Sequence, residues 1–276
     1  MAGFFSRRPI CAGALLAFSV VAALPAHAQC SASSYPVALP HIAFGGPTGG
    51  AIWSTTLLIR NTGSSSASVT VCYFGDSGTA LSVPFNGTSV TSSTVTVPAN
   101  GQAELTPDTT PTSTVAGWAA FAGGLPAGVT AQAVFNWESP AAGICILSAP
   151  VQGLQFPASN SQAVAPIVSN PSGTLSMPFD NTNGQVSGYA FANTTNKAVN
   201  LTLTFYSESG SELGTYTPAQ LPGFGHTEFL LNQSGIPSAV TTAKGVMVLS
   251  SSSVYPLGFR FDISGSTIES FSTWLP

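Results

Sequence analysis

The chain has 276 residues, of which 44% are hydrophobic and only 6% are charged, and its formal net charge is −4. So few basic residues leave no basic patch, which argues against nucleic acid as a partner. Beyond the N-terminus no run of about 18 apolar residues occurs, so we expect no transmembrane helix. Ser, Thr, Asn, Gln and Gly must cover most of the surface, and a weakly charged surface of this kind suits a cell-surface or matrix setting.

The N-terminus has the pattern of an export signal. Arg7 and Arg8 precede an apolar run over 10–24, which is too short for a stable membrane span. An A-x-A cleavage motif follows and ends at Ala28. The sequence therefore predicts a signal peptide over 1–28, cleaved after Ala28, and a secreted or cell-surface location. The general secretory and twin-arginine routes both stay open.

One stretch of the chain occurs twice. Residues 61–78 and 193–210 align without a gap at a spacing of 132 residues. In both copies apolar residues alternate with polar ones, as in a strand with one buried face. Each copy closes on a glycine-containing turn, which suits a hairpin. The identical pairs are Asn61/Asn193, Thr62/Thr194, Thr70/Thr202, Ser77/Ser209 and Gly78/Gly210.

Further segments match between the two halves. Leu57 and Ile59 correspond to Tyr189 and Phe191 at the same spacing of 132 residues. Helical periodicity is absent throughout, and the 28 Gly and 21 Pro would interrupt helices. Short alternating strands with Gly and Pro turns indicate a sandwich. The other matched segments are 97–105 with 221–229, 115–121 with 242–248, and 129–137 with 254–262.

The sequence thus predicts an all-β protein with two tandem immunoglobulin-like β-sandwich domains. The first domain is expected over 29–157 and the second over 175–276. Between them, 158–174 is rich in Ser, Asn, Pro and Ala and is predicted to be a linker. Closing strands are expected at 144–151 and 268–275.

Three cysteines remain beyond the signal, and export permits a disulfide. Cys72 and Cys145 both lie in β-patterned runs, so we predict a Cys72–Cys145 bridge that leaves Cys30 free near a mobile terminus. A Cys30–Cys145 bridge is the alternative, because the sequence alone does not settle connectivity. A catalytic thiol is disfavoured, since no His neighbours any of the three in sequence.

The candidate catalytic residues do not form a recognisable set. Glu104 and Glu228 occupy equivalent places in the two halves, and an acid–base pair would have to converge on one cleft. Equivalent positions in tandem domains usually lie far apart. His41 lies in the first half and His226 in the second, and neither has a Cys or another His at the sequence spacing of metal ligands. The segment after Asp180 departs from the calcium-loop pattern and is expected to be a turn. We therefore expect no catalytic residue, metal or cofactor.

Two aromatic residues are candidates for a sugar platform. Phe224 lies in a glycine-flanked turn and Tyr255 precedes a proline, so both are expected to be exposed. Pyranose rings pack their apolar faces on exposed aromatic side chains. Phe224 and Tyr255 are therefore the predicted binding residues.

The second half resembles a module family that recurs in secreted bacterial proteins and has no established activity. The resemblance rests on MPFDNTNGQVSGYAFAN, GHTEFLL, GVMVLSS and PLGFRFD, of which FDNT and LGFRF are the most specific parts. This module often stands beside a partner similar to residues 41–151. The resemblance covers most of the chain beyond the signal. It implies a tandem β-sandwich and an extracellular location, and it carries over no functional residues.

Three functional hypotheses follow. The leading one is a secreted, non-catalytic protein for adhesion, cell-surface structure or protein contact, with another surface protein or a polysaccharide as its partner. The alternative is a carbohydrate-binding accessory module. The third is an extracellular hydrolase with an unrecognised site. It predicts a cleft in which two carboxylates, or a carboxylate and His41 or His226, lie within contact distance.

Overall fold

The computed structural model describes residues 30–47, 50–139, 143–144, 155–156, 159–167, 169, 173–250, 253–262 and 267–271. These residues form strands and turns without an α-helix. Among them no helix has the length and apolar character needed to cross a bilayer. The predicted signal peptide and Cys145 lie outside the described residues.

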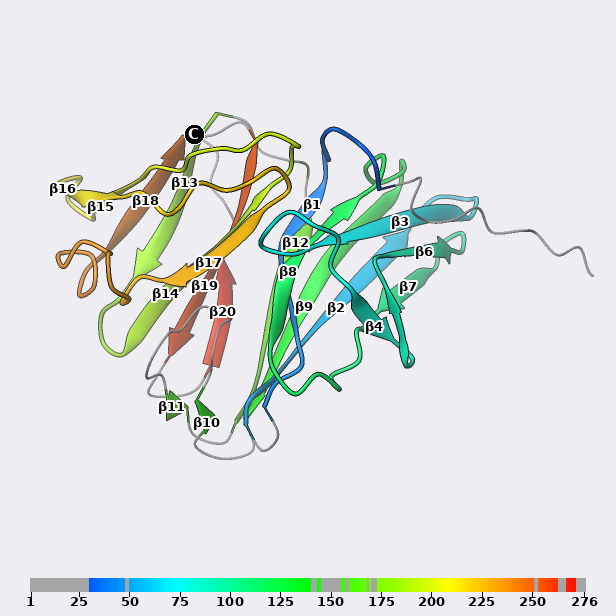
Figure 1. Ribbon diagram of the computed structural model, residues 1–276, viewed down its shortest axis with the longest axis horizontal. Coiled ribbons are helices and arrows are strands. Elements are labelled where there is room, and N and C mark those ends of the chain that lie inside the picture. Colours follow the sequence, from blue (N-terminus) through cyan, green and yellow to red (C-terminus); the bar gives the residue numbers. More distant parts are fainter. Residues whose placement is uncertain are drawn as a thin grey trace, which may run out of the picture.

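The described strands form antiparallel sheets that make up two sandwich-like bodies (Figure 1). Two small hairpins, β4 (Val83–Phe85) with β5 (Thr88–Val90) and β10 (Gly143–Ile144) with β11 (Gln155–Phe156), accompany them. The first body contains β1 (Ala38–Phe44), β2 (Ile52–Asn61), β3 (Ala67–Phe74), β6 (Ser92–Val97), β7 (Gln102–Leu105), β8 (Val115–Phe121), β9 (Val129–Ser139) and β12 (Ser159–Ile167). The second body contains β13 (Thr174–Asp180), β14 (Gln185–Asn193), β15 (Leu203–Ser207), β16 (Glu212–Tyr216), β17 (His226–Leu230), β18 (Lys244–Ser250), β19 (Val254–Asp262) and β20 (Thr267–Phe271).

The two bodies have the same strand order. One sheet of the first body runs β1-β8-β3-β6, and its counterpart runs β13-β18-β15-β16. The other sheet runs β12-β9-β2-β7, and its counterpart, the β14 sheet, runs β20-β19-β14-β17. Leu57 pairs with Leu105, and Tyr189 pairs with Phe229 in the corresponding place. Residues that align between the halves therefore hold equivalent register positions.

The predicted linker is wrong, because most of it is a strand of the first body. Residues 159–167 form β12, which pairs with β9 along its whole length. Ala163 and Ala165 are buried while Val164 between them is 46% exposed, so the strand does alternate. Small side chains and a polar composition hid this alternation in the sequence. Pro166 is tolerated because β12 is an edge strand.

The closing strands differ between the two bodies. In the second body β20 pairs with β19 and overlaps the predicted closing strand over 268–271, and residues 272–275 lie outside the described residues. In the first body β12 takes this place, not the predicted segment 144–151, of which residues 145–151 lie outside the described residues.

A buried asparagine ends the second strand of each body. Asn61 is 1% exposed, and its Nδ2 donates to the carbonyls of Ser65 at 2.8 Å and Val97 at 3.2 Å. Its Oδ1 accepts the amide of Gly63 at 2.8 Å. These bonds hold the connection to the next strand, which accounts for asparagine at both positions. Asn193 makes the corresponding bonds, to the carbonyls of Lys197 and Pro222 and from the amide of Thr195.

The β14 sheet is covered on both faces. Tyr189 and Phe191 point into the core of the second body. Val186, Phe259 and Phe261 point the other way and join the core of the first body. Because successive residues of a strand face opposite sides, near-continuous burial of β14 means that two layers cover it. The two bodies therefore share a hydrophobic core.

The disulfide joins Cys30 to Cys72, with their Cα atoms 5.8 Å apart. The predicted Cys72–Cys145 bridge is therefore wrong, as is the alternative Cys30–Cys145 bridge, and Cys30 is not free. The reason is the direction in which the side chains of β3 point. Val71 and Tyr73 point into the core of the first body, whereas Cys72 points outward, where the N-terminal lead-in packs across it.

The turn after β3 rests directly on a turn of the second body. Gly78 has a φ of 78°, and a Cβ added there would lie 1.9 Å from the carbonyl oxygen of Gly223. Gly210, its counterpart in the second body, has a φ of 81°, and a Cβ added there would meet nothing within 4 Å. Comparing substitutions at Gly78 and Gly210 therefore separates the effect of backbone conformation on stability from the effect of the contact between the two turns.

We expect Gly78→Ala to destabilise the protein more than Gly210→Ala. Both changes place alanine in the left-handed region, at about 1–2 kcal/mol. Gly78→Ala also forces the two turns apart, and overpacking of this kind adds about 1–3 kcal/mol. Urea unfolding followed by tryptophan fluorescence measures both losses. Equal losses in the two variants would contradict the close approach of the turns.

Candidate functional site

Four polar side chains meet where the two bodies touch, and we call them the interbody cluster: His41, His226, Glu228 and Asp76. His41 Nδ1 lies 3.3 Å from His226 Nε2 and 3.0 Å from Glu228 Oε2. His226 Nδ1 lies 2.8 Å from Asp76 Oδ1. Asp76 and His41 belong to the first body, and His226 and Glu228 to the second. The contacts therefore alternate between the two bodies along the cluster.

Local strand features aim these side chains at one another. His226 and Glu228 are two residues apart on β17, so they point to the same face, toward the first body. The pairing of β1 with β8 shifts register between Leu39 and Ile42, where Pro40 has no amide proton to donate. An irregularity of this type turns a side chain away from its regular direction. It brings His41 to the interface.

The interbody cluster is almost sealed from solvent. His41 and His226 are each 3% exposed, and the Glu228 side chain is 7% exposed. The His41 ring stacks against Phe135 and His226, with centroid distances of 6.0 and 5.5 Å, and Phe259 meets it edge-on. These aromatic contacts fix the plane of the His41 ring. Only Asp76 reaches the surface, with a side chain that is 63% exposed.

The hydrogen bonds select one tautomer of His226. The Asp76 carboxylate can only accept, so His226 Nδ1 carries the proton and donates to it. His226 Nε2 then keeps its lone pair and faces His41 Nδ1. By the same rule His41 Nδ1 carries a proton, because it faces the Glu228 carboxylate and the lone pair of His226 Nε2. Once His41 Nδ1 releases that proton, His41, His226 and Glu228 offer one metal-ligand atom each, and these three atoms lie within 4.8 Å of one another.

The space beside the cluster is small. A cavity lined by His41, Glu228, Gly188 and Phe259 leaves about 10 Å³ for the centre of a water molecule. That is the lower limit for holding a single water. The geometry suits a cation or a hydrogen-bond relay, and it leaves no room for an organic substrate.

The sequence did not predict this cluster. Glu104 is exposed on β7, at the position that corresponds to Glu228 on β17, so the two glutamates do not converge. Glu228 instead contacts His41. The hydrolase hypothesis requires such a contact between a carboxylate and a histidine in a cleft, whereas this one is buried inside the protein. The one available signal was the i, i+2 placement of His226 and Glu228 on one strand.

The exposure predicted for the sugar platform is wrong, because Phe224 and Tyr255 lie at the interface between the bodies. Tyr255 is 4% exposed. The half-buried Phe224 ring stacks on Phe74 at 5.3 Å and meets Tyr35 at 5.5 Å, and its carbonyl accepts a hydrogen bond from Trp118 Nε1 at 2.7 Å. The turn was expected to face solvent, but it docks against the first body.

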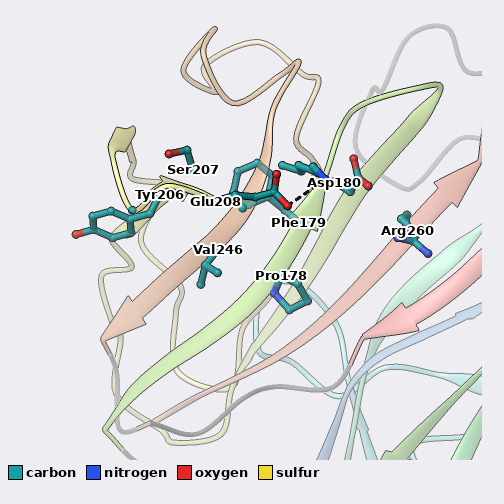
Figure 2. Close-up of a pocket in the computed structure, with 11 residues that line it drawn as sticks. Pro178, Phe179, Asp180, Tyr206, Ser207, Glu208, Val246 and Arg260 are labelled. Atoms are coloured by element: carbon teal, nitrogen blue, oxygen red, sulfur yellow. Dashed lines mark ion pairs between the residues drawn. The ribbon is translucent and has the colours of Figure 1, made fainter.

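An open groove lies over β13, β15 and β18, and we call it the outer groove (Figure 2). Its volume is about 710 Å³. Two of the four cations and two of the ten carboxylates beyond the signal line it. Figure 2 shows the carboxylates of Glu208 and Asp180 at the same end, with Val246 and Pro178 farther along the strands. The lining also includes Tyr206, Lys244 and Arg260.

The charges of the outer groove are partly paired. Lys244 Nζ lies 3.0 Å from Glu208 Oε1, and both side chains are about half exposed or more. Glu208 accepts a hydrogen bond from Lys244 and adds its negative charge, and both effects raise the pKa of Lys244. Asp180 Oδ1 accepts the amide and hydroxyl of Thr182 at 2.9 and 2.7 Å, so it forms a local turn.

We expect Phe224→Asn to lower the free energy of unfolding by about 2 kcal/mol, through lost contacts with Phe74 and Tyr35. Phe224 has a φ of 56°, and the corresponding residue of the first body, Asn100, has a φ of 53°. Asparagine tolerates this region well, so the substitution removes packing without adding backbone strain. Urea unfolding measures the loss. A stability equal to or above that of the unmodified protein would show that backbone strain outweighs the packing.

Comparison with known proteins adds no family to these observations. No protein-family model matches the chain, and no curated protein matches it.

Proposed function

We propose that the protein is a secreted, non-catalytic β-sandwich protein that acts by contact at its surface, in adhesion, cell-surface structure or protein contact. The observation that carries this proposal is the burial of the interbody cluster. Within the described part of the chain, it contains the one group of three or more His, Cys, Asp or Glu side chains that converge. A general acid or base has to reach the proton that it transfers, and no substrate fits beside these side chains.

Three features support an extracytoplasmic location. The disulfide between Cys30 and Cys72 is of the kind that forms and persists in oxidising compartments. The predicted signal peptide over 1–28 agrees with it. The resemblance to a module of secreted bacterial proteins points the same way.

We also propose that the two bodies are tandem copies of one sandwich. Their identical strand orders and equivalent registers support this. The immunoglobulin-like description has less support at the level of strand pairing. In immunoglobulin domains the first two strands, A and B, share a sheet, whereas β1 and β2 lie in different sheets here.

The exported chain is expected to show no turnover in a broad screen of ester, glycoside and peptide substrates, and to bind saturably to isolated cell envelopes. The reason is that the converging side chains of His41, His226 and Glu228 are buried and have no access to substrate. Glu228→Gln is the decisive variant, and Glu104→Gln is the matched control. Turnover that Glu228→Gln abolishes and Glu104→Gln preserves would contradict a non-catalytic role.

The outer groove favours a second candidate, a carbohydrate-binding module. Sugar hydroxyls both donate and accept hydrogen bonds, and the groove presents carboxylates beside cations. Tyr206 on β15 adds an aromatic ring at its edge. These residues replace Phe224 and Tyr255 as the candidate sugar contacts.

For this second candidate, Tyr206→Ala and Lys244→Ala should each weaken polysaccharide binding at least tenfold, because each removes a direct contact. Arg60→Ala, which removes an exposed cation of the first body, should leave binding unchanged. A glycan array followed by affinity measurement tests this. If the unmodified protein retains no glycan, the carbohydrate-binding candidate is removed.

A further inference from the structure

We propose that the interbody cluster binds one divalent transition-metal ion, with Zn²⁺ the best match, through His41 Nδ1, His226 Nε2 and a Glu228 carboxylate oxygen. This goes beyond the proposed function, because it assigns a metal site that bridges the two bodies. The donor atoms of the three residues lie within 4.8 Å of one another.

The distances between donor atoms fit such an ion. Zinc bonds of about 2.0–2.1 Å in tetrahedral geometry place neighbouring donors about 3.3 Å apart. His41 Nδ1 and His226 Nε2 are 3.3 Å apart, and His41 Nδ1 and Glu228 Oε2 are 3.0 Å apart. These two pairs need adjustments of only a few tenths of an ångström to hold an ion, and the third pair, His226 Nε2 and the Glu228 carboxylate, lies within 4.8 Å.

The chemistry of the donors selects the class of metal. Two imidazoles with one carboxylate suit zinc and other imidazole-binding transition metals, whereas Mg²⁺ and Ca²⁺ prefer oxygen ligands throughout. The cavity beside His41 and Glu228 has room for one water, which supplies a fourth ligand. Phe135 and Phe259 pack against His41 and exclude further solvent.

Asp76 is the positioning residue of this site. Its carboxylate holds His226 Nδ1 at 2.8 Å, and its main-chain carbonyl accepts the amide of His226 at 3.2 Å. A carboxylate on the distal nitrogen fixes the tautomer and ring orientation of a metal-binding histidine. His226 is thereby prepared to offer Nε2 to the ion.

The ion would join the two bodies, because His41 comes from β1 and His226 and Glu228 come from β17. The ligands converge only when the bodies are docked. Metal affinity and docking are therefore thermodynamically linked, and the bound ion stabilises the docked arrangement.

The test uses the exported full-length chain without a polyhistidine tag, stripped with a chelator and titrated with Co²⁺ and then Zn²⁺. We expect one ion per chain, a visible Co²⁺ spectrum of a four-coordinate site, and displacement by Zn²⁺. His41→Ala and His226→Ala should each weaken binding at least 100-fold. Glu104→Gln should bind as the unmodified chain does, because Glu104 is exposed at the matching position on β7.

A second measurement does not depend on whether the variants fold. On Zn²⁺ binding, the ¹⁵N resonances of His41 Nδ1 and His226 Nε2 should shift in the unmodified protein, whereas His226 Nδ1 should keep its proton. Asp76→Asn should retain the Co²⁺ spectrum with about 10- to 100-fold weaker affinity. Less than one ion per chain at micromolar free Zn²⁺, or unshifted histidine resonances, overturns the proposal.

Discussion

The structure depends on the burial of the second face of the β14 sheet. One face packs against its own partner sheet, and the other carries Val186, Leu257, Phe259 and Phe261 into the core of the first body. Apolar burial is the main favourable term in folding, and here it acts between the bodies as well as within each. The docked turn at Phe224 and the interbody cluster both follow from this contact.

Strand alternation accounts for the part of the fold that was predictable. The matches of Leu57 with Tyr189 and of the segments around Glu104 and Glu228 predicted strands that the structure places in equivalent registers. The composition was misleading where the buried residues are small. Ala163 and Ala165 form the buried face of a strand, but the sequence around them has the composition of a linker. The partner of Cys72 was not predictable, because it depends on a lead-in that crosses the outside of the sheet.

The candidate site could not be predicted, for a different reason. His41 and His226 are 185 residues apart and belong to separate bodies. Alternation and motif spacing describe neighbours within a strand or hairpin, whereas this proximity arises from docking. Phe224 shows the same limit, because its glycine-flanked turn has the sequence of an exposed loop and yet packs on Phe74 and Tyr35.

Among the described strands, the docking face occurs in one body and not in the other. Where β14 presents Val186, Gly188, Ala190 and Ala192 to the first body, the aligned positions of β2 are Ser54, Thr56, Leu58 and Arg60. Threonine, leucine and arginine are too bulky or too polar to accept another sheet in the same close approach. Stacking of bodies through this face therefore has a direction, because the corresponding face of the first body does not suit a further sheet.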